Sequence, residues 1–167
     1  MTLSFAAALL SACASITAIP AEGIDLMNPE HGAATLATCS RNAPMATGGF
    51  FTPSPADITK LESDLATLLS ISTENAGQSA SFAVDLSSYR REYIGYQRDG
   101  ARMIYGNFLP VLRRSNPVRM RSNGLPTIAC DGGAAFFGVE YAIADGKVEA
   151  VRFNGSLGGR AQEDILR

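Results

Sequence analysis

Residues that build common catalytic and metal sites are scarce in this chain of 167 residues. Histidine occurs once, at His31, so a Ser-His-Asp or Cys-His arrangement would depend on a residue in a stretch without regular apolar spacing. Cysteine occurs three times, at Cys13, Cys39 and Cys130, and these positions together with His31 show no spacing typical of zinc sites. The sequence therefore predicts no catalytic residues, no metal and no cofactor.

Long apolar runs and a strong net charge are also missing. Beyond the first dozen residues, no apolar run approaches the roughly 18 residues that a membrane-spanning helix needs. The formal net charge of −2 gives no indication of a nucleic-acid partner. What is present is 46% apolar and 18% charged residues, the composition of an ordinary globular protein.

The amino-terminal residues have the layout of a signal peptide. An apolar run from Leu3 to Leu10 is too short to span a bilayer and is followed by small residues. The tetrad Leu10-Ser11-Ala12-Cys13 resembles the lipobox of bacterial lipoproteins, which implies cleavage before Cys13 and attachment of a diacylglycerol to its thiol. An ordinary secretory leader, cut after Ala14 or near Ala21, is the alternative.

Lipidation of Cys13 would anchor the protein to a membrane, because each buried methylene contributes about 0.8 kcal/mol and two or three acyl chains add many of them. Ala14 is not the aspartate that retains enterobacterial lipoproteins at the inner membrane. The resemblance therefore implies an outer-membrane lipoprotein that faces the periplasm. Its partners would be the membrane itself and an anionic envelope component or an envelope protein.

The segment after Cys13 is rich in Ala, Gly, Thr and Pro and shows neither helical nor strand periodicity. We therefore expect a signal peptide at 1–12, a lipidated cysteine and flexible tether at 13–49, and a single α+β domain at 50–167. With Cys13 assigned to lipid, Cys39 and Cys130 are predicted to form a disulfide in an oxidising periplasm. Two unpaired buried thiols are the alternative.

The predicted domain begins with a helix. Ser54-Pro55-Ala56-Asp57 combines a capping serine, a proline at the first helical position and a carboxylate three residues after the cap. Apolar residues then recur at helical spacing, which predicts an amphipathic helix from Pro55 to Ser70 that packs against a core.

Two hairpins follow. Asp99-Gly100 favours a tight turn between strands at 89–97 and 102–108, and a three-residue loop ending at Gly146 would join strands at 135–143 and 147–154. That second register places Phe137 opposite Phe153 and buries one apolar face. The prediction is one amphipathic amino-terminal helix packed on a four-stranded antiparallel meander, the element order of cystatin-like folds.

Glu140 is the acid that stands out, because it interrupts an apolar strand. It could be an acid with a shifted pKa in a cleft, or it could form a half-exposed ion pair with Arg152 on the neighbouring strand. A hydrolase acting on an envelope polymer would use either Glu140 or Asp131 as its acid. With no second acid placed beside Glu140, we favour the ion pair.

Positive charge is concentrated in one segment. Residues 90–121 contain eight arginines against Glu92 and Asp99, a local formal charge of +6. The planar guanidinium suits phosphate or carboxylate groups, so the arginines between the two hairpins are the predicted binding residues for an anionic component. They are Arg113, Arg114, Arg119 and Arg121. A solvated face neutralised by acids elsewhere is the alternative.

Further segments, at 89–95, 104–108, 130–141 and 153–155, are similar to those of small uncharacterised bacterial lipoproteins. The third contains CDGG and FFGVEY, and the last is FNG. The resemblance covers roughly residues 85 to 156 and implies a shared fold and cellular location, but no activity. The sequence as a whole thus predicts a cell-envelope lipoprotein that is a non-catalytic binding or interaction module. A hydrolase acting on an envelope polymer is the alternative.

Overall fold

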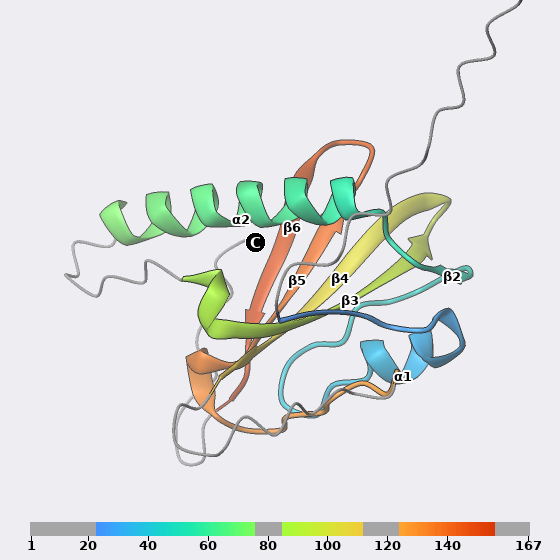
Figure 1. Ribbon diagram of the computed structural model, residues 1–167, viewed down its shortest axis with the longest axis horizontal. Coiled ribbons are helices and arrows are strands. Elements are labelled where there is room, and N and C mark those ends of the chain that lie inside the picture. Colours follow the sequence, from blue (N-terminus) through green and yellow to red (C-terminus); the bar gives the residue numbers. More distant parts are fainter. Residues whose placement is uncertain (1–22, 76–84, 112–123, 156–167) are drawn as a thin grey trace, which may run out of the picture.

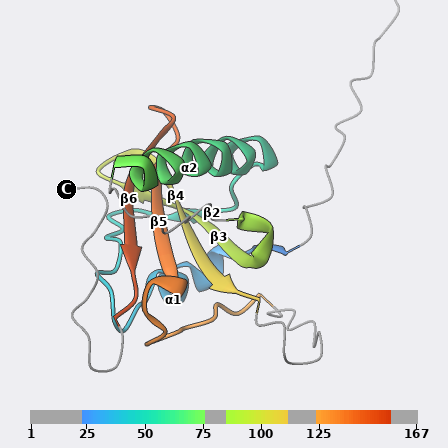
Figure 2. The same ribbon diagram turned by 90° about the vertical axis from the view of Figure 1, so that its left-hand side faces the viewer.

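The structure is a computed structural model that describes residues 23–75, 85–111 and 124–155. These residues form an α+β fold around one mixed sheet of six strands. Helix α2 (Pro55–Asn75) covers one side of the sheet, and the short helix α1 (Gly32–Leu36) lies on the opposite side (Figures 1 and 2). No helix of the described residues combines the length and the apolar character that crossing a membrane requires.

The sheet has the strand order β1-β3-β4-β5-β6, and β2 pairs with the same edge of β3 as β1 does. Strand β1 runs parallel to β3, whereas every other pair is antiparallel. The strands are β1 (Ile24–Leu26), β2 (Phe50–Phe51), β3 (Tyr89–Arg98), β4 (Ala101–Pro110), β5 (Phe137–Ala142) and β6 (Lys147–Phe153). Three short 3-10 helices complete the description: η1 (Pro29–His31), η2 (Leu86–Ser88) and η3 (Gly133–Ala135).

Helix α2 begins where the sequence predicts. The hydroxyl oxygen of Ser54 accepts a hydrogen bond from the backbone N–H of Asp57 at 3.1 Å, which satisfies one of the free N–H groups of the first turn. Its apolar stripe is buried against the sheet. On the same face, Glu62 accepts hydrogen bonds from Arg91 and from the hydroxyl of Tyr93, at 2.8 and 2.7 Å. Apolar packing and polar contacts therefore hold the helix to strand β3.

The first hairpin turn is the one that its residues predict, and the second hairpin agrees with its prediction only in part. Asp99 and Gly100 have φ angles of 51° and 82°, the left-handed conformation that a tight hairpin turn requires. In the second hairpin, Phe137 pairs with Phe153, as predicted. A register shift between Glu140 and Tyr141 then moves the pairing by one residue, so that the turn is longer than the predicted three-residue loop.

The sheet is buried on both faces rather than on one. All residues from 91 to 96 of β3 are buried, and successive side chains point to opposite faces. Tyr93 belongs to the core beneath α2, whereas its neighbour Ile94 packs on the other face with Met27 and Leu36. A second layer, formed by the chain around α1, therefore covers the face that the sequence left exposed.

Two predictions on architecture need correction. The α+β class is confirmed, but the description as one helix on four antiparallel strands is wrong, because β1, β2 and α1 add to it and β1 makes the sheet mixed. These elements also precede α2, which departs from the cystatin-like order. The predicted tether at 13–49 is partly folded, since residues 23–49 contribute β1, η1 and α1 and pair with β3. Residues 1–22 lie outside the described ranges.

Candidate functional site

The second face of the sheet carries buried polar side chains in neighbouring positions. Glu92 pairs with Asn107 across β3 and β4, and Tyr105 pairs with Glu140 across β4 and β5. These four residues are between 0 and 5% exposed. Buried polar groups must be hydrogen-bonded to be tolerated, so the layer that covers this face has to supply partners.

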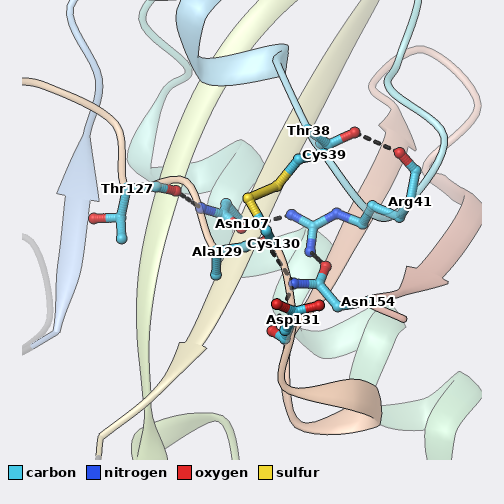
Figure 3. The surroundings of a disulfide bond; sticks show 9 residues. All are labelled: Thr38, Cys39, Arg41, Asn107, Thr127, Ala129, Cys130, Asp131 and Asn154. Atoms are coloured by element: carbon cyan, nitrogen blue, oxygen red, sulfur yellow. Dashed lines mark hydrogen bonds between the residues drawn. A yellow bond between two sulfur atoms is a disulfide. The ribbon is translucent and has the colours of Figure 1, made fainter. Parts of the chain in front are cut away.

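Arg41 supplies the central partner. It lies in the loop after α1, and its Nη2 donates to the hydroxyl of Tyr105 at 2.6 Å and to Oδ1 of Asn107 at 2.7 Å. Its Nη1 donates to Oδ1 of Asn154, just beyond β6 (Figure 3). One guanidinium therefore joins strand β4, the end of β6 and the covering loop.

Gly138 makes room for this arrangement. A Cβ atom at that position would lie 2.7 Å from the hydroxyl of Tyr105 and 2.9 Å from Nε of Arg41. Both distances are shorter than a carbon atom tolerates. The guanidinium thus occupies the space above the sheet that any other residue at 138 would fill with its own side chain.

Among the described residues, the charge of Arg41 has no direct counterpart. None of the ion pairs formed by the described residues involves it, and its buried Nε has no hydrogen-bond partner there. Burial raises the pKa of Tyr105 above its ordinary value of 10, and the neighbouring Arg41 opposes that rise. Tyr105 is therefore protonated at neutral pH and stands next to a cation that no described carboxylate pairs.

The predicted disulfide between Cys39 and Cys130 is confirmed, with Cα atoms 5.0 Å apart, and the free-thiol alternative is wrong. The bridge is adjacent to the Arg41 contacts. Asn154 Nδ2 donates to the carbonyls of Ala129 and Asp131, at 2.7 and 3.2 Å, one on each side of Cys130 (Figure 3). The disulfide and Asn154 thus hold together two irregular segments of the covering layer. One is the loop after α1, which contains Cys39 and Arg41, and the other is the segment that contains Cys130.

Glu92 holds the segment that precedes Cys130, through Thr127. Its carboxylate accepts hydrogen bonds from the backbone N–H and the hydroxyl of Thr127, at 3.0 and 2.7 Å, and from Asn107 at 3.0 Å. Arg90 lies 3.1 Å away and also pairs with Asp25 of β1. Glu92 is therefore fully engaged, and it reaches Arg41 only through the amide of Asn107.

A small polar hollow opens beside Arg41, where the two segments meet. Its volume is about 10 Å³, room for roughly one water molecule. The hollow is lined by Thr35, Ala37, Thr38, Arg41, Tyr105, Asn107, Thr127, Ile128 and Ala129. It can admit a single atom or small group of a ligand, while the remainder of that ligand would stay at the surface.

Glu140 does not line this hollow. It is 3% exposed, and its Oε2 accepts from the hydroxyl of Tyr96 at 2.7 Å and from Arg98 at 2.9 Å. Its Oε1 accepts from Arg152, the partner that the sequence predicted. Burial raises the pKa of Tyr96, and the hydrogen bond to Glu140 adds to the rise. The ion pair is thus buried rather than half-exposed, and both oxygens that a catalytic acid would use are occupied.

The other sequence candidates fall in different places. Asp131 is exposed, and its backbone carbonyl accepts a hydrogen bond from Nδ2 of Asn154. His31 ends η1, where its carbonyl accepts a hydrogen bond from Thr35. Within the described ranges, no group of three or more His, Cys, Asp or Glu side chains is placed to hold a metal ion.

The predicted lipidation site Cys13 and the predicted binding residues lie outside the described ranges; those binding residues are Arg113, Arg114, Arg119 and Arg121. Of the four described arginines in segment 90–121, three are ion-paired: Arg90 with Asp25 and Glu92, Arg91 with Glu62, and Arg98 with Glu140 and Glu149. The fourth, Arg102, stacks on the ring of Phe51 at 4.1 Å.

Sequence reasoning missed Arg41, because Ser40-Arg41-Asn42 matches no motif and lies in the predicted tether. One signal was available: Arg41 is two residues from Cys39, which was expected to be bonded to the domain. Comparisons of the chain with protein-family models, with curated proteins and with solved structures found no match.

Proposed function

We propose that this protein is a cell-envelope lipoprotein, anchored in the outer membrane through acyl chains on Cys13, whose folded domain is a non-catalytic binding module. The observation that carries the proposal is the Cys39–Cys130 disulfide. It uses two of the three cysteines and leaves Cys13, in its lipobox-like tetrad, available for lipid. Because disulfides persist in oxidising compartments, the bridge and the lipobox support the same location.

The binding role is proposed for an anionic envelope component. Three of the four described arginines of segment 90–121 are neutralised by acids, so the surplus charge of that segment resides chiefly in the four arginines between the hairpins. A module anchored at a membrane surface would present them to anionic lipid or glycan. The hydrolase alternative has no supporting observation, since Glu140 is buried and fully engaged.

Metabolic labelling with a fatty-acid analogue tests the anchor. The wild type should be labelled and should sediment with the outer membrane, whereas Cys13→Ser should carry no label. A double variant, Cys39→Ser with Cys130→Ser, is the matched control and should be labelled like the wild type. Equal labelling of Cys13→Ser and the wild type would refute lipidation.

Vesicle binding tests the anionic partner separately. The Cys13→Ser chain, which has no anchor, should bind phosphatidylglycerol vesicles at about 0.1 M salt and lose them near 1 M, because screening shortens from about 10 Å to about 3 Å. Replacing Arg113, Arg114, Arg119 and Arg121 by Gln should abolish binding. The control replaces the exposed Lys60 and Lys147 by Gln instead, and this variant should keep most of the vesicle binding. Unchanged binding in the four-arginine variant would contradict the proposed surface.

A further inference from the structure

The side-chain amides around the hollow have no donor hydrogen left. Asn107 Nδ2 donates to Glu92 and to the carbonyl of Thr127, both at 3.0 Å, and Asn154 Nδ2 donates to two carbonyls beside Cys130. The Oδ1 atom of each asparagine accepts from Arg41. Since an amide carries two donor hydrogens, both asparagines are held in fixed orientations as acceptors for the guanidinium.

The threonine hydroxyls that line the hollow are also engaged as donors. Thr35 donates to the carbonyl of His31 at 2.9 Å, and Thr38 donates to the carbonyl of Arg41 at 2.5 Å. Thr127 donates to Glu92 at 2.7 Å. None of the three has a hydroxyl hydrogen left for a further acceptor.

Tyr105 and Arg41 are different, because they have donors to spare. The hydroxyl oxygen of Tyr105 accepts from Arg41, but its hydrogen has no acceptor among the described residues, although the side chain is only 2% exposed. Arg41 has five N–H hydrogens, and three of them make the bonds to Tyr105, Asn107 and Asn154. Arg41 and Tyr105 therefore provide side-chain donors that have no acceptor among the described residues, and no described carboxylate pairs with the Arg41 cation.

Donors next to an unpaired positive charge in a partly buried hollow attract an anionic acceptor. A single guanidinium matches a single negative charge, which favours a carboxylate over a doubly charged phosphate. The space admits about one water-sized atom, so one oxygen would enter. Ile128 lines the hollow and is 55% exposed, and it offers apolar contact to the part of the ligand that stays outside.

We propose that Arg41 and Tyr105 form a carboxylate-binding site, in which one oxygen of an acidic ligand enters the hollow between the two disulfide-linked segments. The proposal rests on the binding function above and specifies the group that the folded domain recognises. Acidic sugars and peptide carboxylates share this chemistry, and both are possible sources of the group.

The test is a titration of the ¹⁵N-labelled full-length chain, purified in detergent, in which the side-chain amide signals of Asn107 and Asn154 are followed by NMR. Acetate should shift both signals in a saturable way at constant ionic strength. Chloride and inorganic phosphate are the comparison anions. Equal or stronger responses to either of them would overturn the carboxylate assignment, and no saturable response to acetate would overturn the site.

Two variants locate the site. Tyr105→Phe keeps the ring and Arg41 but removes the free donor, so acetate affinity should fall about tenfold, the usual effect of one hydrogen bond to a charged group. Arg102→Gln removes an exposed arginine that stacks on Phe51, and its acetate affinity should equal that of the wild type. Unchanged affinity in Tyr105→Phe, or an equal loss in Arg102→Gln, would place the binding elsewhere.

Glucuronate and N-acetylalanine then distinguish the two sources, an acidic sugar and a peptide carboxylate. Tighter binding of either one than of acetate supports the proposal and names the source, whereas weaker binding of both would show that the hollow excludes carboxylates of natural size. No vesicle, envelope extract or acyl transfer enters this titration. A negative result therefore overturns the Arg41 site alone, and the labelling of Cys13 still decides the proposed function.

Discussion

Arg41 donates a hydrogen bond to Asn154, which lies 113 positions later in the chain. The contact joins the loop after α1 to the end of β6. Asn154 in turn holds the carbonyls on either side of Cys130, so the disulfide and this side-chain pair clamp the same two segments over the sheet. The covering layer is thus held by polar contacts as well as by apolar burial.

Replacing Asn154 should therefore destabilise the fold. Asn154 is 1% exposed, and Asn154→Ala removes the hydrogen-bond partner of two backbone carbonyls and of one nitrogen of Arg41. The expected loss in the free energy of unfolding is about 2–4 kcal/mol, measured by urea denaturation. Asn42→Ala, an exposed asparagine next to Arg41, should change it by less than about 0.5 kcal/mol. Equal effects of the two variants would contradict the clamp.

Gly138→Ala should also destabilise the protein, because the new Cβ would lie 2.7 Å from the hydroxyl of Tyr105 and 2.9 Å from Nε of Arg41. Overpacking of this kind costs about 1–3 kcal/mol. Gly49 is the matched control, since a Cβ there meets nothing within 4 Å. The measurement is the urea midpoint of each variant, and a midpoint for Gly138→Ala at or above that of Gly49→Ala would count against the packing.

Removal of the disulfide should lower stability without changing the fold. The bridge spans 91 positions, and closing a loop of that length contributes about 4–5 kcal/mol in the chain-entropy model. The double variant Cys39→Ser with Cys130→Ser should unfold at a lower urea concentration than the oxidised wild type. Reductant should lower the wild type to the same midpoint and leave the double variant unchanged. If reductant does not affect the wild type, the bridge does not contribute.

Alkaline pH should unfold the protein through its tyrosines. Burial raises the pKa of all five above the ordinary value of 10; they are Tyr89, Tyr93, Tyr96, Tyr105 and Tyr141. Because the raised pKa belongs to the folded state, this contribution to stability is fully present below pH 10 and is lost as pH rises above it. Urea midpoints on either side of pH 10 should show the decline, and it should be shallower in Tyr105→Phe. Constant stability across pH 10 would show that the tyrosines titrate freely.

Several features could be predicted because they depend on neighbours in the chain. The start of α2 requires a serine cap and a carboxylate three residues later, and the turn at Asp99-Gly100 requires residues that tolerate positive φ. The disulfide followed from cysteine count and compartment rather than from geometry. In each case, a few residues were enough to predict the feature.

The second layer could not be predicted in this way. Residues 23–49 have the composition of a spacer, yet Met27 and Leu36 are buried on the sheet and Ile24–Leu26 extend it. An irregular segment carries no period from which its burial can be read, and its stability comes from partners far along the chain.

The sequence alone determined the local elements of this protein: the helix from Pro55, the tight turn at Asp99-Gly100 and the apolar alternation of the strands, because these are set by residues within a few positions of one another. Only the tertiary structure decided that both faces of the sheet are covered and that Arg41 meets Tyr105, Asn107 and Asn154. The alternation of side chains along a strand shows that the sheet has two faces, but it does not show which segments cover each face. The partners of Arg41 are 64, 66 and 113 positions away, so folding alone brings them together.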